Sequence, residues 1–254
     1  MHINFESSDY ITLDAELREN HTAKAAVLML HGINSDKDEE GLFVRLSSDL
    51  PNEEYNIFRF DFRCHGNSDN NNHMTIQGET EDFLNALSFI IQRWNIPVYV
   101  VAASFGAVSL LNSVNCDLFR YIKGVILLNP VLDLQHTFFL SPFEWPKQSF
   151  NEDSYKKLEK QGYFLLDNGI HINIDLFNEL VEKKPFLNLS QINVPVLLIH
   201  GDADTYVSYE KSLLYSKVIQ KCDFVTVKNA NHGFGNGIHE DYVRSTICSW
   251  IKEK

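Results

Sequence analysis

The sequence has few of the features that mark metalloproteins, disulfide-rich proteins and nucleotide-binding proteins. It contains only four cysteines, none in a CxxC pair, and its ten histidines include no HExxH motif. These absences argue against a disulfide framework and against a zinc site. No GxGxxG loop and no phosphate-binding P-loop occurs, so a nucleotide is not indicated either. We expect a protein that works without a cofactor or a metal.

Basic residues and long apolar runs are also scarce. Twenty-two Lys and Arg face 34 Asp and Glu, for a formal net charge of −12, which argues against a nucleic-acid partner or an anionic membrane. No apolar run approaches the roughly 20 residues that span a bilayer, and the N-terminal MHINFESSDY does not resemble a secretory signal. We expect a cytoplasmic protein acting on a small molecule. The oligomeric state stays open, with a homodimer as one option.

Apolar runs of strand length alternate with helical patterns along most of the chain. The runs occupy residues 25–30, 55–60, 97–102, 122–128, 194–199 and 224–227. Helical spacing of apolar residues predicts helices over 77–94, 208–219 and 239–251. This alternation predicts a mostly parallel sheet with helices on both faces, and residues 3–7 and 10–19 predict an antiparallel pair at its edge. Such sheets bind ligands beyond the carboxyl ends of their strands.

Residues 134–190 break this alternation and are rich in aromatic side chains. Within them Asn168-Gly169 stands between two apolar runs, a strong signal for a β-hairpin near 163–174, and a helix is expected to follow near 175–183. A connection of this length is more often a binding element than an idle loop. We therefore predict a core built from 1–133 and 191–254, with 134–190 inserted as a lid.

Residues capable of chemistry follow the predicted strands. Ser104 stands in Ala102-Ala103-Ser104-Phe105-Gly106 between a strand and a helix, HGDADTYVS follows 194–199, and His232 stands in Asn231-His232-Gly233 after the last strand. Each signal is weak alone: Ser104 fits a helix N-cap equally well, and a lone histidine is more often structural. Together with His31-Gly32 and DFRCHGNSD at 61–69, their order resembles the α/β-hydrolase superfamily. Ala102 and Cys64 stand where that superfamily usually has glycine.

The resemblance implies a catalytic triad. Ser104 would be the nucleophile, His232 the general base and Asp204 the acid that orients the imidazole. Asp202 is the alternative acid, but the usual HGxxDxxV pattern aligns Asp204. The resemblance also implies an oxyanion hole made by backbone N–H groups of Ile33 and Phe105.

The predicted architecture is thus an α/β-hydrolase fold with a lid insertion between the sixth and seventh strands. The insertion is similar to the small lid of bacterial feruloyl and cinnamoyl esterases. Phe138, Phe139 and Trp145 are the candidates to line a substrate pocket, and the alternative is that they form the core of the insertion itself.

The resemblance implies a serine carboxylic-ester hydrolase that forms an acyl-enzyme, with a short-chain or hydroxycinnamate-type ester as substrate. A thioesterase or acyltransferase would use the same three side chains. A protein of another class, one that binds a ligand on this scaffold without turning it over, is the remaining alternative.

Overall fold

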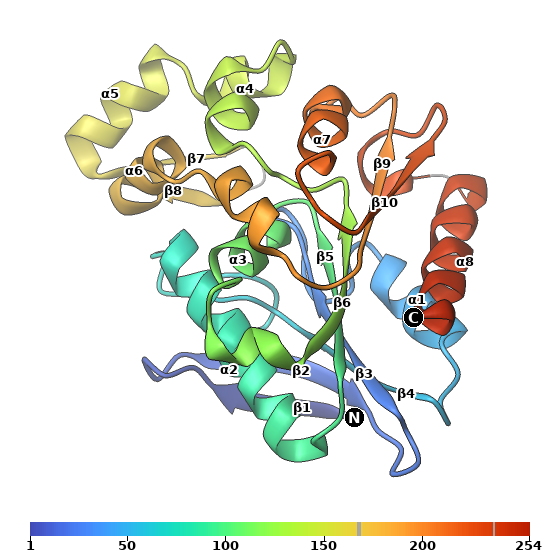
Figure 1. Ribbon diagram of the computed structural model, residues 1–254. Helices are drawn as coiled ribbons and strands as arrows, with labels where there is room; N and C mark the ends of the chain where they lie inside the picture. The colour runs from blue at the N-terminus through green and yellow to red at the C-terminus, as the bar shows by residue number, and fades with distance from the viewer. Residues whose placement is uncertain (167–168, 236) are drawn as a thin grey trace.

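The structure of the protein is a computed structural model that describes residues 1–166, 169–235 and 237–254. Within these ranges eight strands form one sheet in the order β1-β2-β4-β3-β5-β6-β9-β10 (Figure 1). The strands are β1 (His2–Glu6), β2 (Thr12–Arg18), β3 (Ala25–Leu30), β4 (Tyr55–Phe60), β5 (Val98–Ala103), β6 (Ile122–Leu128), β9 (Val196–Gly201) and β10 (Cys222–Val227). β2 pairs antiparallel with β1 and β4, and the other neighbours in this sheet pair in parallel. The predicted mostly parallel sheet is confirmed.

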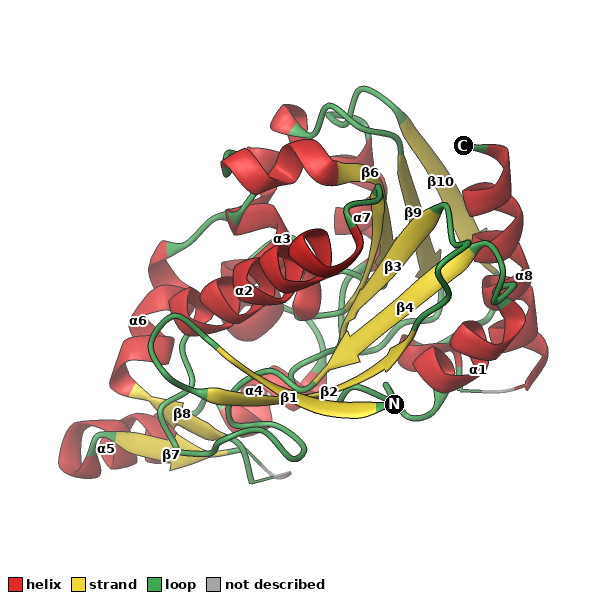
Figure 2. Cartoon of the chain, turned by 90° about the horizontal axis from the view of Figure 1, so that it is seen from below, coloured by secondary structure: helices red, strands yellow, loops and turns green. Residues whose placement is uncertain are grey.

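Helices cover both faces of the sheet, as the two views in Figures 1 and 2 show. Those of the core are α1 (Leu42–Asp49), α2 (Ile76–Trp94), α3 (Gly106–Asn112), α7 (Tyr209–Ser216) and α8 (Gly237–Glu253), with 3-10 turns at η1 (Asp117–Tyr121) and η4 (His232–Phe234). Val27 and Met29 of β3 pack with α1 and α8, whereas Leu28 and Leu30 pack with α2 and α3. Because both faces are covered, β3, β4, β5 and β9 are buried along their whole length, which explains why their sequences are mostly apolar.

The segment between β6 and β9 forms a separate group of short elements. They are a π-helical turn η2 (His136–Leu140), α4 (Glu144–Ser149), α5 (Glu152–Gln161), β7 (Tyr163–Leu165), β8 (His171–Asn173), α6 (Ile174–Glu182) and a 3-10 turn η3 (Pro185–Gln191). β7 and β8 pair antiparallel, with Phe164 opposite Ile172. Of the expected Asn168-Gly169 turn, Asn168 lies outside the described residues, and Gly169 has a left-handed φ of +87°.

This segment is anchored over the end of the sheet where β5 gives way to α3. Phe138, Phe164 and Leu176 pack in one apolar cluster with Phe105 and Val108 from the start of α3. Figure 1 shows α4, α5 and α6 gathered on that side of the sheet. A bilayer-spanning helix is not found among the residues that the structure describes.

Candidate active site

Ser104 lies in the sharp turn that joins β5 to α3. Its φ of +48° is left-handed, a conformation that costs a residue with a β-carbon about 1–3 kcal/mol. A hydrogen bond to the end of β6 stabilises the turn, because the Ser104 N–H donates to the Leu128 carbonyl over 2.8 Å. Phe105 occupies the N-cap position of α3 and no side chain caps it, so capping does not explain the serine. The strained turn instead presents the Ser104 hydroxyl beyond the end of the sheet.

Gly106 allows α3 to begin this close to the neighbouring strand. A β-carbon at Gly106 would lie 2.6 Å from the His31 carbonyl oxygen and 2.7 Å from that of Leu30, closer than packed atoms can approach. The other small residue, Ala102, is fully buried, and its methyl group packs in the apolar cluster beneath α2 and α3. An alanine is therefore accommodated where the superfamily usually has glycine.

His232 connects Ser104 to Asp204 through its two ring nitrogens. Its Nε2 lies 3.0 Å from the Ser104 Oγ, and its Nδ1 lies 2.7 Å from the Asp204 Oδ2. The three side chains come from the turn after β5, the loop after β9 and the η4 turn after β10. Carboxyl ends of parallel strands lie at one edge of a sheet, which is why residues so distant in sequence meet here.

The second oxygen of Asp204 is held by its own loop. Oδ1 accepts hydrogen bonds from the N–H groups of Tyr206 at 2.7 Å and Val207 at 2.9 Å. Burial alone would raise the pKa of Asp204, but hydrogen bonds from His200 and His232 lower it well below its usual range. Asp204 therefore stays ionised next to the imidazole.

Asp202, the alternative acid, does not reach His232. Its Oδ1 accepts from the Asn229 N–H over 2.6 Å, and its own N–H donates to the Val227 carbonyl. Asn229 has a left-handed φ of +59°, so Asp202 braces the turn that leads from β10 toward His232. The structure thus brings Asp204, and not Asp202, to the imidazole.

Ile33 and Phe105, the predicted oxyanion-hole residues, line the same cavity as Ser104. Among the described residues, neither backbone N–H donates to a protein acceptor. The peptide that carries the Ile33 N–H is fixed through its other end, because the Gly32 carbonyl accepts from the Ser35 N–H at 3.1 Å and lies 2.8 Å from the His31 Nδ1. Since a peptide is planar, holding the carbonyl also fixes the direction of the N–H.

His31 shapes this loop as a neutral imidazole. Its Nε2 accepts from the Phe62 N–H over 3.0 Å, so the proton sits on Nδ1 and points to the Gly32 carbonyl. Burial, with a smaller contribution from His65, lowers the pKa of His31 well below its usual value. Among the described residues, the His31 ring bonds to the Gly32 carbonyl and the Phe62 N–H and forms no hydrogen bond with the Ser104 hydroxyl. Its role is therefore structural.

The cavity above Ser104 has a volume of about 510 Å³ and is lined by both polar and apolar side chains. Phe138 and Trp145, two of the three aromatic candidates of the insertion, lie in its wall. Trp145 is fixed by a 3.0 Å hydrogen bond from its Nε1 to the Tyr206 carbonyl. Phe139, the third candidate, is not among the residues that line this cavity. Its ring packs edge-on against Phe150 and Phe177, at 5.3 and 5.6 Å between centroids, inside the insertion.

Glu39 is a residue of this site that the sequence analysis missed. It lines the cavity, and its Oε2 accepts from the Gly32 N–H over 2.8 Å. Its backbone has a left-handed φ of +46°, which turns the side chain back toward the loop. Burial raises the pKa of Glu39 to about 7. In the sequence it belongs to the acidic run DKDEE, which gives no sign that one of its carboxylates faces a cavity.

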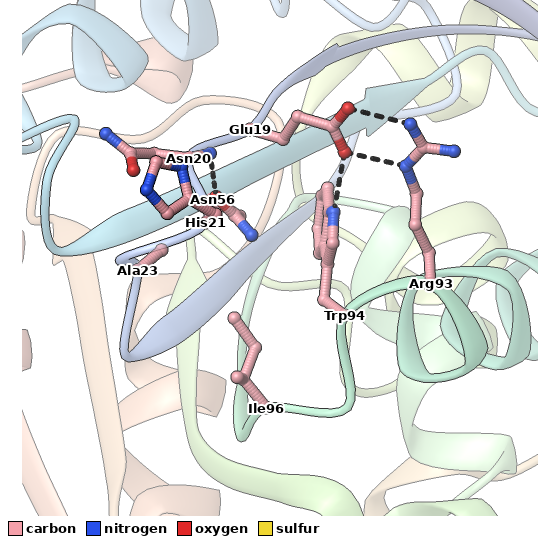
Figure 3. Close-up of a pocket in the computed structure, with 8 residues that line it drawn as sticks. All are labelled: Glu19, Asn20, His21, Ala23, Asn56, Arg93, Trp94 and Ile96. Carbon is pink, nitrogen blue, oxygen red and sulfur yellow. Dashed lines mark hydrogen bonds and ion pairs between the residues drawn. The ribbon is translucent and has the colours of Figure 1, made fainter.

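A second pocket, of about 640 Å³, lies at the opposite end of the sheet (Figure 3). Figure 3 shows Glu19 turned toward Arg93 and Trp94, with which it forms three hydrogen bonds. The bond from Arg93 is the main reason that the pKa of Glu19 falls to about 2. The charged side chains of this pocket, Glu19 and Arg93, are therefore paired with each other. In the described part of the chain, no group of three or more His, Cys, Asp or Glu side chains could hold a metal ion.

Comparison with known protein families decides the membership of this chain. The sequence pattern of the family described as serine aminopeptidase, S33, matches residues 21–161, more than half of the chain. The chain belongs to this family. The match includes Ser104 and the loop that carries Ile33, and it ends before Asp204 and His232. No curated protein matches the chain.

Solved structures extend the likeness over the whole length of the chain. Est1E from Butyrivibrio proteoclasticus, with ferulic acid bound, has a TM-score of 0.82 at 20% identity, covering 99% of this chain and 98% of that one. The esterase PF2001 of Pyrococcus furiosus has a TM-score of 0.76 at 18% identity, covering 100% and 90%. At these identities the likeness shows the fold, which confirms the α/β-hydrolase architecture predicted from the sequence.

Proposed function

We propose that this member of the family is a serine carboxylic-ester hydrolase that works through an acyl-enzyme. The observation that carries the proposal is the row of contacts from Asp204 through His232 to the Ser104 hydroxyl, at 2.7 and 3.0 Å. A serine hydroxyl is a weak nucleophile until an adjacent base takes its proton, and this arrangement supplies that base. Ser104 and His232 line a cavity of about 510 Å³, which is large enough for a small ester.

In the first half of the proposed reaction, Ser104 Oγ attacks the ester carbonyl carbon while His232 Nε2 takes the hydroxyl proton. Asp204 keeps the second ring proton on Nδ1 and stabilises the imidazolium. The N–H groups of Ile33 and Phe105 donate to the oxygen of the tetrahedral intermediate. When the intermediate collapses, His232 returns the proton to the leaving alcohol, and the acyl group stays on Ser104.

In the second half, water attacks the acyl group and loses a proton to His232 Nε2. The same two N–H groups stabilise the second oxyanion. Collapse returns the proton to Ser104 and releases the carboxylic acid. No cofactor enters either half.

We further propose a hydroxycinnamate-type ester as the substrate, bound beneath residues 134–190 acting as a lid. Phe138 and Trp145 supply aromatic surface in the cavity wall against which a planar acyl group stacks. The likeness to a structure that contains ferulic acid supports the same choice. All four cysteines are free, in keeping with a cytoplasmic location.

Steady-state assays with aryl esters of acetate and of hydroxycinnamate, a thioester and an amino-acyl arylamide test the proposal. The expected result is turnover of both esters, lost in Ser104→Ala and retained in Ser109→Ala, a matched change of a buried serine one turn along α3. Faster turnover of the thioester or the arylamide would reassign the reaction. Saturable ligand binding without turnover of any of them would identify a binding protein instead.

A further inference from the structure

His200 contacts the acid of the proposed triad from the core of the protein. It is the last residue of β9 before Gly201, and its side chain is completely buried. Its Nε2 is 3.2 Å from the Asp204 Oδ2 and 3.2 Å from the Val207 carbonyl oxygen. Both neighbours are acceptors, so Nε2 carries the proton and donates it between them.

The surroundings of the other ring nitrogen of His200, Nδ1, indicate that the contact between Nε2 and Asp204 has a function. Among the described residues, Nδ1 has no hydrogen-bond partner, although it is buried. Leaving a buried polar atom unpaired is unfavourable, and an apolar side chain at this position would avoid it. The ring packs edge-on against Tyr209 of α7, at 5.9 Å between centroids, which fixes its plane. The contacts of Nε2 with Asp204 and with the Val207 carbonyl are what an apolar residue could not provide, and only the first reaches the proposed triad.

We propose that His200 is a positioning residue that holds the Asp204 carboxylate in line with the His232 imidazole. The inference rests on the proposed function, because His200 acts only through Asp204 and His232. Oδ2 of Asp204 receives both imidazoles, His232 at 2.7 Å and His200 at 3.2 Å, while Oδ1 is held by the loop. Without His200, Oδ2 loses its donor on the core side and keeps only the contact with His232, so the carboxylate is held less firmly in this orientation.

Loss of the hydrogen bond from His200 also changes the basicity of the Asp204 carboxylate. The hydrogen bond from His200 is one reason that the pKa of Asp204 lies below its usual range. A carboxylate with one donor fewer is more basic and stabilises the His232 imidazolium more strongly. We therefore expect the acid limb of the pH–activity profile to shift when this donor is lost.

Replacing His200 leaves the other groups around Asp204 and His232 chemically unchanged. Glu39 and the Tyr206 ring, 5.5 Å from the imidazole ring, face His232 from the cavity side, and Glu40 lines the same cavity. On the core side, the Tyr209 hydroxyl is engaged with Thr226 Oγ1 at 2.8 Å. A shift of the acid limb in a His200 variant is thus assigned to the lost donor.

The experiment compares three variants on an aryl ester that the wild type hydrolyses. His200→Phe removes the donor and keeps a flat ring, His200→Gln restores an N–H donor, and Tyr209→Phe is the control that packs on the same ring. We expect His200→Phe to lower kcat about 10-fold, to change KM less than about 2-fold and to shift the acid limb by about half a pH unit. His200→Gln recovers most of the loss, and Tyr209→Phe matches the wild type. A His200→Phe protein that is less stable but has unchanged kcat and an unchanged acid limb overturns the inference.

Nitrogen-15 NMR of wild-type protein labelled at histidine tests the same contact without a variant that has to fold. The expected spectrum shows the His200 proton on Nε2 throughout the pH range of activity, and a proton on Nδ1 overturns the inference. The two proposals fail in different ways. If the wild type hydrolyses no ester, the proposed function fails while the spectrum still reports the His200–Asp204 bond. If Ser104→Ala abolishes hydrolysis and His200→Phe has no effect, only the role of His200 fails.

Discussion

The Nε2 atom of His232 lies 3.0 Å from the Oγ of Ser104, although 128 positions separate the two residues in the chain. The sheet order explains the distance, because β5, which precedes Ser104, and β10, which precedes His232, run in the same direction with β6 and β9 between them. Loops from both carboxyl ends then reach over the same edge.

Substitution of the two candidate acids separates their roles. We expect Asp204→Asn to lower kcat about 10⁴-fold, because the amide no longer favours the reactive tautomer and charge state of His232. Asp202→Asn should stay within about 3-fold of the wild type, because the asparagine oxygen still accepts from Asn229. Steady-state kinetics of the two variants checks this. A stronger effect at Asp202 than at Asp204 would contradict the assignment.

Gly106→Ala should damage the turn at Ser104. Its β-carbon would meet two backbone carbonyl oxygens at 2.6 and 2.7 Å, which requires α3 to move away from β3. We expect a loss of about 3 kcal/mol in the free energy of unfolding, measured by urea denaturation, with ester hydrolysis reduced as well. Gly235→Ala is the control, since apart from its chain neighbours no atom of the described residues lies within 4 Å of its added carbon. Equal stability of the two variants would rule out the close approach of α3.

Glu39 makes stability depend on pH in a direction opposite to that of an ion-paired carboxylate. Its pKa in the folded protein is about 7, above the ordinary value of 4.5, so the folded state binds the proton more tightly than the unfolded chain. The stability that this proton contributes is fully present below the pKa of Glu39 in the unfolded chain. It is lost as the pH rises through the pKa of Glu39 in the folded protein. Glu39→Gln cannot ionise, so its stability relative to the wild type should rise by about 3 kcal/mol as the pH increases from 4.5 to 7.

Urea unfolding of Glu39→Gln and wild type at several pH values measures this difference directly. Glutamine keeps a carbonyl oxygen to accept from Gly32, so the loop contact itself is preserved. A difference between the two proteins that does not change with pH would show that Glu39 has no raised pKa.

The aromatic wall of the cavity should control substrate preference. Trp145→Ala removes stacking surface, and we expect KM for a hydroxycinnamoyl ester to rise about 10-fold while KM for an acetyl ester changes less than about 2-fold. Phe139→Leu is the matched control, because Phe139 packs inside the insertion and away from the cavity. An equal change of both KM values in Trp145→Ala would argue against a stacking role.

The fold was predictable because its signals are local and repeated. The apolar run at 122–128 coincides with β6, and those at 25–30 and 55–60 coincide with β3 and β4. In each, burial of most positions on both faces favours apolar residues, which is the pattern that predicted a strand. Ser104 and His232 were predicted from their place after such runs together with the resemblance to the α/β-hydrolase superfamily.

Residues whose position depends on tertiary packing could not be predicted. The run at 194–199 was expected to end before His200, but pairing of Thr226 with His200 and of Val227 with Gly201 extends β9 and buries the histidine. Phe138 and Phe139 are adjacent in a π-helical turn, so only one of the two faces the cavity, and their sequence does not indicate which. Asp204 was preferred to Asp202 only through the HGxxDxxV pattern of the resemblance, and the structure gives the two residues different partners, His232 and Asn229.

Trapping of the acyl-enzyme tests the central claim most directly. The wild type is mixed with a hydroxycinnamoyl aryl ester, quenched in acid during the first turnover, digested and analysed by mass spectrometry. We predict the mass of a single acyl group on the peptide that contains Ser104, released with a burst of the aryl alcohol, and no acylated peptide from Ser104→Ala. Undiminished hydrolysis by Ser104→Ala, or an acyl group on a different residue, would contradict the account.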